Sequence, residues 1–65
     1  MRNNFNITTL IGKTITEATE IAGWAGFSIR VMREDTTKYF GTADLKFNRI
    51  NAEVDNGFIT TTSIG

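Results

Sequence analysis

The sequence predicts an α+β fold in which one α-helix packs on a small mixed β-sheet, with a long exposed loop between the first strand and a carboxyl-terminal hairpin. Three observations carry this prediction: a helix-capping pattern followed by apolar residues at helical spacing, two later segments of alternating polarity, and an Asn-Gly pair between β-rich segments. The chain contains no proline, repeat or linker, so residues 1–65 are expected to form a single domain. Residues 1–9 are expected to be an extended amino-terminal arm that Phe5 and Ile7 pin to the body.

The helix is predicted to begin after Thr14, because Thr14-Ile15-Thr16-Glu17 has the form of a capping box. In this motif the Thr14 hydroxyl accepts a hydrogen bond from the Glu17 amide, and the Glu17 carboxylate reaches back to the Thr14 amide. The apolar residues that follow share one stripe at helical spacing: Ile15, Ala18, Ile21, Ala22 and Ala25. Gly26 is a suitable left-handed terminator, and Trp24 is expected to pack the end of the helix onto the sheet.

Two segments carry the alternation of β-strands. The first strand is predicted over residues 27–32, and alternation resumes near Leu45 and runs to Val54. Asn56-Gly57 can adopt the positive φ values of a two-residue hairpin turn, so residues 58–62 are expected to form the return strand. In the second segment the alternation predicts a core face and an opposite face; the core face carries Ile50, Ala52 and Val54, and the opposite face carries Leu45, Phe47, Arg49, Asn51 and Glu53.

Composition excludes several kinds of chemistry. The chain has neither cysteine nor histidine, so it cannot form a disulfide and offers no imidazole to activate a serine nucleophile. The seven acidic residues are spread along the chain, without a paired-carboxylate spacing, a glycine-rich phosphate loop or a calcium-loop pattern. The sequence therefore predicts a protein that is not an enzyme and that holds no metal and no cofactor.

The balance of charge and the lack of long apolar runs restrict the classes of partner that are expected. Seven basic and seven acidic residues give a formal net charge of zero, which argues against binding to the phosphate backbone of nucleic acid. No apolar run has secretory length or approaches the roughly 20 residues of a membrane span. We therefore expect a cytoplasmic protein without a signal peptide, with neither nucleic acid nor membrane as its partner.

The predicted loop, about residues 34–44, is the segment for which a function is expected, because long connections in very small domains are usually functional or disordered. It contains Lys38, Tyr39 and Phe40. These aromatic side chains could form an exposed patch that a partner covers. Alternatively, residues 38–42 extend a strand and place one of the rings in the core.

The order and spacing of several motifs resemble the potato inhibitor I family of serine peptidase inhibitors. The residues that carry this resemblance are Leu10-Ile11-Gly12-Lys13, Thr14 with Glu17-Ala18, the run from Thr42 to Ile50, Val54-Asp55 and Ile64-Gly65. Three further segments are similar to the related bacterial and fungal elastase inhibitors: Arg49-Ile50-Asn51, Glu53-Val54-Asp55 and Gly57-Phe58-Ile59-Thr60. The resemblance covers the chain from about Leu10 to Gly65.

In this family an extended, substrate-like loop lies across the active site of the peptidase. The resemblance implies a reactive loop of Gly41, Thr42, Ala43, Asp44 and Leu45, with the scissile bond between Ala43 and Asp44. Arg49 would brace the loop through Thr42 and Asp44; the second brace, an arginine in plant-type members, is Asn51 here, as in the elastase-inhibitor branch. A small residue at position 43 suits an elastase-like or subtilisin-like serine peptidase as the partner.

Other interpretations remain open at this point. Thr42, Asp44 and Arg49 could form a purely structural cluster. A second function is a cytoplasmic binding protein, possibly phage-encoded, that sequesters a nucleotide-like signal molecule or blocks a host protein; its candidate ligand-binding residues are Arg33, Lys38, Tyr39 and Phe40, which supply charge for phosphate and rings for base stacking. A third is a structural module whose edge strand pairs with another copy, which would make a homo-oligomer.

Overall fold

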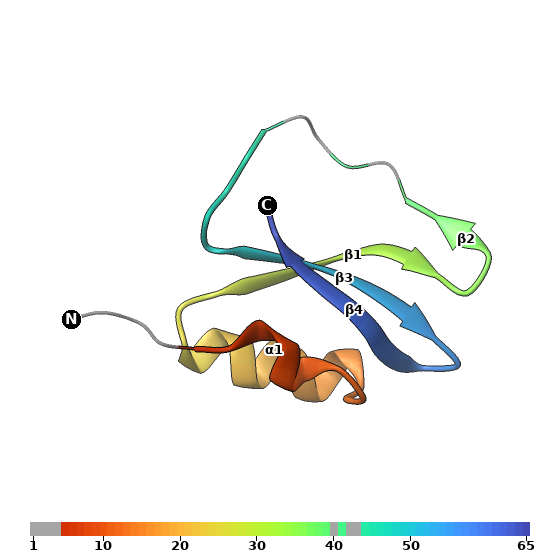
Figure 1. The fold of residues 1–65 in the computed structure, drawn as a ribbon, viewed down its shortest axis with the longest axis horizontal. Helices are drawn as coiled ribbons and strands as arrows, with labels where there is room; N and C mark the ends of the chain where they lie inside the picture. Colours follow the sequence, from red (N-terminus) through yellow and green to blue (C-terminus); the bar gives the residue numbers. More distant parts are fainter. Residues whose placement is uncertain (1–4, 40, 42–43) are drawn as a thin grey trace.

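The computed structural model describes residues 5–39, 41 and 44–65, and over these residues α1 (Ile15–Trp24) packs on a four-stranded sheet (Figure 1). The strands are β1 (Ser28–Glu34), β2 (Thr37–Lys38), β3 (Arg49–Asp55) and β4 (Phe58–Ile64), in the spatial order β2-β1-β3-β4. The central pair β1 and β3 is parallel and both outer pairs are antiparallel, so the predicted α+β fold with a mixed sheet is confirmed. No helix in the described part of the chain is long and apolar enough to cross a membrane.

The helix begins where the capping box predicts. The Glu17 amide donates to Thr14 Oγ1 at 3.2 Å, and the Thr14 amide donates to Glu17 Oε1 at 3.1 Å. Gly26 follows the helix with φ of +86°, as expected of a left-handed terminator. The prediction for Trp24 is wrong, because its side chain is 90% exposed. Ala22 is buried against the sheet, and a residue two positions later points about 200° further round the helix, away from the sheet.

The amino-terminal segment is not extended throughout, as residues 1–9 were expected to be. Ile7–Leu10 form a 3-10 helix, η1, because Asn6 caps it: Asn6 Oδ1 accepts from the Thr8 amide at 3.0 Å. Phe5 and Ile7 do pack against the core, and the centroids of the Phe5 and Phe27 rings lie 5.7 Å apart. Residues 1–4 lie outside the described residues.

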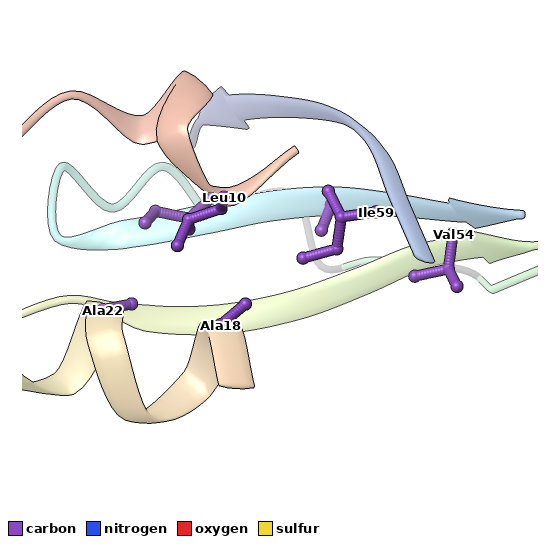
Figure 2. Packing of buried hydrophobic residues seen from close by; sticks show 7 residues of the cluster. Leu10, Ala18, Ala22, Val54 and Ile59 are labelled. Atoms are coloured by element: carbon purple, nitrogen blue, oxygen red, sulfur yellow. The ribbon is translucent and has the colours of Figure 1, made fainter. Parts of the chain in front are cut away.

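The core lies between α1, η1 and one face of the sheet. Figure 2 shows Ala18 and Ala22 of α1 pointing toward the strands. The buried residues are Leu10, Ala18, Ala22, Ile50, Ala52, Val54 and Ile59. Along β3 burial alternates strictly, so the core face of Ile50, Ala52 and Val54 is confirmed and Arg49, Asn51 and Glu53 lie on the opposite face. The strand begins at Arg49 and not near Leu45 as predicted, because residues 47–48 form a turn before it. We call this opposite face of the sheet the outer face.

The segment after β1 differs from the predicted loop. The strand continues to Glu34, and β2 pairs back onto it after a turn in which Asp35 has φ of +55°. Tyr39 extends this pairing by donating its amide to the Met32 carbonyl at 2.9 Å. Two residues of strand are too few to show alternation in a sequence, which is why β2 was not predicted.

The carboxyl-terminal hairpin forms at the predicted turn. Asn56 and Gly57 have φ of +54° and +86°, the left-handed values of a two-residue hairpin loop. β4 extends to Ile64, two residues beyond the expected end of the return strand. In Figure 1 the segment that leads from residue 44 into β3 lies on the side of the sheet that α1 does not cover.

Candidate functional site

The candidate site is the presenting loop, residues 39–48, together with the outer-face residues beneath it. Of the five expected reactive residues, Gly41, Asp44 and Leu45 are described, whereas Thr42 and Ala43 lie outside the described residues. Leu45 is 66% exposed and Phe47 is 79% exposed. The part of the loop that leads into β3 therefore exposes two apolar side chains that a partner can contact.

Arg49 connects the loop to the end of the chain. Its Nη2 donates to the Asp44 carbonyl at 2.9 Å, and its Nη1 lies 3.7 Å from Asp44 Oδ2. The same guanidinium donates to the Gly65 carbonyl from Nε at 3.1 Å and from Nη2 at 2.7 Å. The Arg49 side chain is only 11% exposed, so these bonds are partly shielded from water. Arg49 thus holds Asp44, one of the two residues that the resemblance assigned to it, and the Thr42 contact falls outside the described residues.

Gly65 is an anchor that the sequence analysis did not identify. Its amide donates to the Arg49 carbonyl at 3.1 Å, and its own carbonyl accepts from the Arg49 side chain. The two residues are therefore joined by hydrogen bonds in which each is both donor and acceptor. Gly65 is buried and has φ of +152°, and a Cβ there would lie 3.0 Å from Asn51 Nδ2. A register counted from the turn alone would place Ile64 opposite Arg49, and the irregularity between Glu53 and Val54 shifts the pairing so that Gly65 stands there instead.

Asn51 supports a second arginine. Its Oδ1 accepts from Arg30 Nε at 3.1 Å, and the two residues are paired across the parallel strands β1 and β3. The Arg30 side chain lies against Gly41: a Cβ built on Gly41 would meet Arg30 Cζ at 3.1 Å and Met32 Cε at 3.2 Å. Sequence reasoning missed Arg30, because its alternation places it on one face of β1 without indicating which residue of β3 stands beside it.

Among the residues proposed for a nucleotide-like ligand, Arg33 is bound by carboxylates of β3. Arg33 donates to both carboxylate oxygens of Asp55 at 2.8 Å each and to Glu53 Oε1 at 3.2 and 3.3 Å. Tyr39 is half-exposed and its hydroxyl donates to Glu34 Oε1 at 3.4 Å, so this ring does not enter the core. Lys38 is exposed beside Arg33 in the sheet, and Phe40 lies outside the described residues.

The hydrogen bonds around Arg33 shift the pKa values of both Arg33 and Asp55. The Arg33 guanidinium and the Thr60 hydroxyl hold the pKa of Asp55 down to about 2, with the Arg33 hydrogen bonds as the larger cause. The same bonds, first to Asp55 and then to Glu53, raise the pKa of Arg33 above its ordinary value. Thr60 Oγ1 donates to Asp55 Oδ2 at 2.9 Å. We call Arg33, Glu53, Asp55 and Thr60 the hairpin cluster, because it lies toward the turn end of β3 and β4.

Two further observations concern the rest of the described surface. Glu20, Ile21 and Trp24 line a shallow apolar hollow on α1, away from the presenting loop. Among the described residues, no three or more carboxylate side chains are placed to hold a metal ion.

No protein-family model matches the chain, and no curated protein matches its sequence.

Proposed function

We propose that this chain is a reversible serine peptidase inhibitor that presents the segment around Ala43-Asp44 as a rigid, substrate-like loop. The observation that carries the proposal is the position of Arg49, which binds Asp44 directly after the expected scissile bond and is itself anchored on Gly65. The partner class is an elastase-like or subtilisin-like peptidase, because residue 43 is an alanine.

Rigidity supports inhibition in two ways. A loop already held in its bound geometry avoids much of the ordering cost that a flexible substrate meets, so its affinity rises without many contacts. The bond to Asp44 also keeps the carboxyl-terminal side of a cleaved loop in place, so religation competes with release of the product. A guanidinium suits this role, since its planar, fixed donors can bind two acceptors at once.

The sharpest test is a change of specificity at residue 43. Wild-type protein is titrated against subtilisin, pancreatic elastase and trypsin, and we expect inhibition of the first two and little of trypsin. Ala43→Lys should transfer inhibition to trypsin, because a basic side chain matches the charged primary pocket of that enzyme. Absence of inhibition of every peptidase at tens of micromolar protein would overturn the proposal.

The structure lends less support to the other candidate functions. In a nucleotide-binding protein Arg33 would need free donors, whereas its guanidinium binds Glu53 and Asp55. Self-association would use an open sheet edge, and on β4 the Ile59 backbone is already occupied: its carbonyl accepts from the Gly12 amide at 2.8 Å and its amide donates to the Lys13 carbonyl at 2.9 Å. Neither alternative is favoured by a specific contact.

A further inference from the structure

We infer that Arg30 is a positioning residue for the part of the presenting loop that precedes the expected scissile bond. This role rests on the proposed function. Arg49 holds the loop after the expected scissile bond, through Asp44. No contact of Arg49 with the arm before that bond is found among the described residues, where Gly41 is the last residue described before Asp44. Arg30 lies against the loop at Gly41, next to Met32 of the same strand.

The contact between Arg30 and Gly41 is close. A methyl group in place of the Gly41 hydrogen would lie 3.1 Å from Arg30 Cζ and 3.2 Å from Nη1, which is tighter than ordinary van der Waals contact. Met32, further along β1, would lie 3.2 Å from the same methyl group. The loop backbone at Gly41 therefore rests directly on two β1 side chains, and glycine provides the space for that approach.

Arg30 is itself held in place from β3. Asn51 Oδ1 accepts from Arg30 Nε at 3.1 Å, which orients the guanidinium plane and leaves its terminal nitrogens on the side of Gly41. The pairing of Arg30 with Asn51 in the parallel ladder fixes the distance between them. Asn51 also lies against Gly65, the anchor of Arg49. The side-chain amide of Asn51 thus contacts both Arg30, which lies against the loop before the expected scissile bond, and Gly65, to which Arg49 is bonded.

The resemblance assigns to position 51 a second brace, which is an arginine in plant-type members of that family and an asparagine here. A guanidinium at position 51 would have to rise from β3. Here the guanidinium rises from the neighbouring strand instead, and Asn51 has become its acceptor. Positive charge beneath the loop is retained, but it is supplied by β1.

The test compares Arg30→Met with Arg33→Met, two variants on the same strand and the same outer face. Both keep the apolar stem and remove the donors, but only Arg30 touches the loop. For Arg30→Met we expect lower NMR order parameters at the Gly41 and Leu45 amides of the free protein, and cleavage of the 43–44 bond by subtilisin faster by about 10- to 100-fold. Arg33→Met should leave both unchanged, although it lowers the midpoint of thermal unfolding.

Asn51 supplies a second arm of the experiment. Asn51→Leu removes the acceptor of Arg30 and should loosen the Gly41 amide in the same way, whereas Asn51→Asp keeps an acceptor and should leave it ordered. If Arg30→Met leaves order and cleavage at the wild-type level, the inference is wrong even if the wild type inhibits. If the wild type inhibits no peptidase, the proposed function fails, while the order parameters still decide the role of Arg30.

Discussion

Arg49 and Arg33 lie on the same outer face of the sheet and each donates to a main-chain carbonyl, Arg33 to that of Asp35, but they differ in their other acceptors. Arg49 donates to two backbone carbonyls, those of Asp44 and Gly65, and has one carboxylate oxygen at a longer distance. Arg33 takes both oxygens of Asp55 and one of Glu53. Arg49 therefore links main-chain atoms of the loop to Gly65, whereas the Arg33 bonds to Asp55 and Glu53 pair opposite charges within the sheet.

This difference separates two tasks within one small domain. The hairpin cluster joins β1 to β3 and β4, so it supports the sheet toward the turn between β3 and β4. The Arg49 contacts join two chain segments that no ladder connects, so they control the shape of the presenting loop. Variants in the two regions should therefore have separable effects on stability and on presentation.

The largest effect is expected for Arg49→Ala. Loss of these charged hydrogen bonds should lower the free energy of unfolding by about 1.5–3 kcal/mol. Displacement of the loop should weaken subtilisin inhibition by about 100-fold and accelerate cleavage of the 43–44 bond. Arg49→Lys, which keeps the charge without the planar fork, should recover only part of the inhibition. Unchanged inhibition in Arg49→Ala would remove the distinction between the two regions.

Ile50→Val should change stability alone. Ile50 is fully buried on the core side of β3, next to Arg49 in the chain but facing the other way. Removing one methylene should lower the free energy of unfolding by about 0.5–1.5 kcal/mol, as read from urea denaturation. Cleavage of the loop under folding conditions should stay at the wild-type rate. Faster cleavage in this variant would mean that the loop senses global stability rather than its own braces.

Acid should weaken the hairpin cluster. The folded-state pKa of Asp55, about 2, lies below its ordinary value of 3.8, so its contribution to stability is present above the ordinary pKa. That contribution is lost as the pH falls through the folded-state value, and urea midpoints should decrease from about pH 4 to about pH 2. Glu17, whose pKa the Thr14 hydrogen bonds lower, adds a decrease of the same sign. Asp55→Asn should remove most of the slope; an unchanged slope would place its origin elsewhere.

The smallest effect is expected for Thr60→Val. This change removes the hydroxyl that donates to Asp55 Oδ2 but leaves Arg33 in place. The pKa of Asp55, followed by NMR titration of its side-chain carboxyl, should rise toward the ordinary value yet remain below it, because Arg33 is the larger cause of the shift. Loop order should not change. A pKa at the wild-type value would show that the hydroxyl does not stabilise the carboxylate.

Features encoded by neighbouring residues could be predicted from the sequence. The capping box places the start of α1, since Thr14 and Glu17 satisfy each other's amides without help from the rest of the fold. Asn56-Gly57 places the hairpin for the same reason, because those residue types tolerate positive φ. The alternation along β3 predicts which side chains face the core, and Arg49 was selected from that pattern together with the family resemblance.

Features that depend on the pairing of distant segments could not be predicted. The bond between Arg30 and Asn51 follows from the parallel register of β1 and β3, and the irregularity between Val31 and Arg33 places Arg33 beside Glu53 on the same face. The exposure of Trp24 follows from which stripe of α1 meets the sheet, and hydrophobicity alone suggested the opposite. The engagement of Arg33 by carboxylates likewise needed the register, which places Glu53 beside it.

The amino-acid sequence by itself determined the local elements of this protein: where the helix starts, where the hairpin turns and which face of β3 is apolar. These are short-range properties, because a cap, a turn or a pattern of alternation is complete within a few residues. The tertiary structure alone decided which charged side chains meet. Arg30, Arg33 and Arg49 have the same chemistry and similar strand environments, and only the register of the sheet gives one a glycine backbone, one a pair of carboxylates and one the end of the chain.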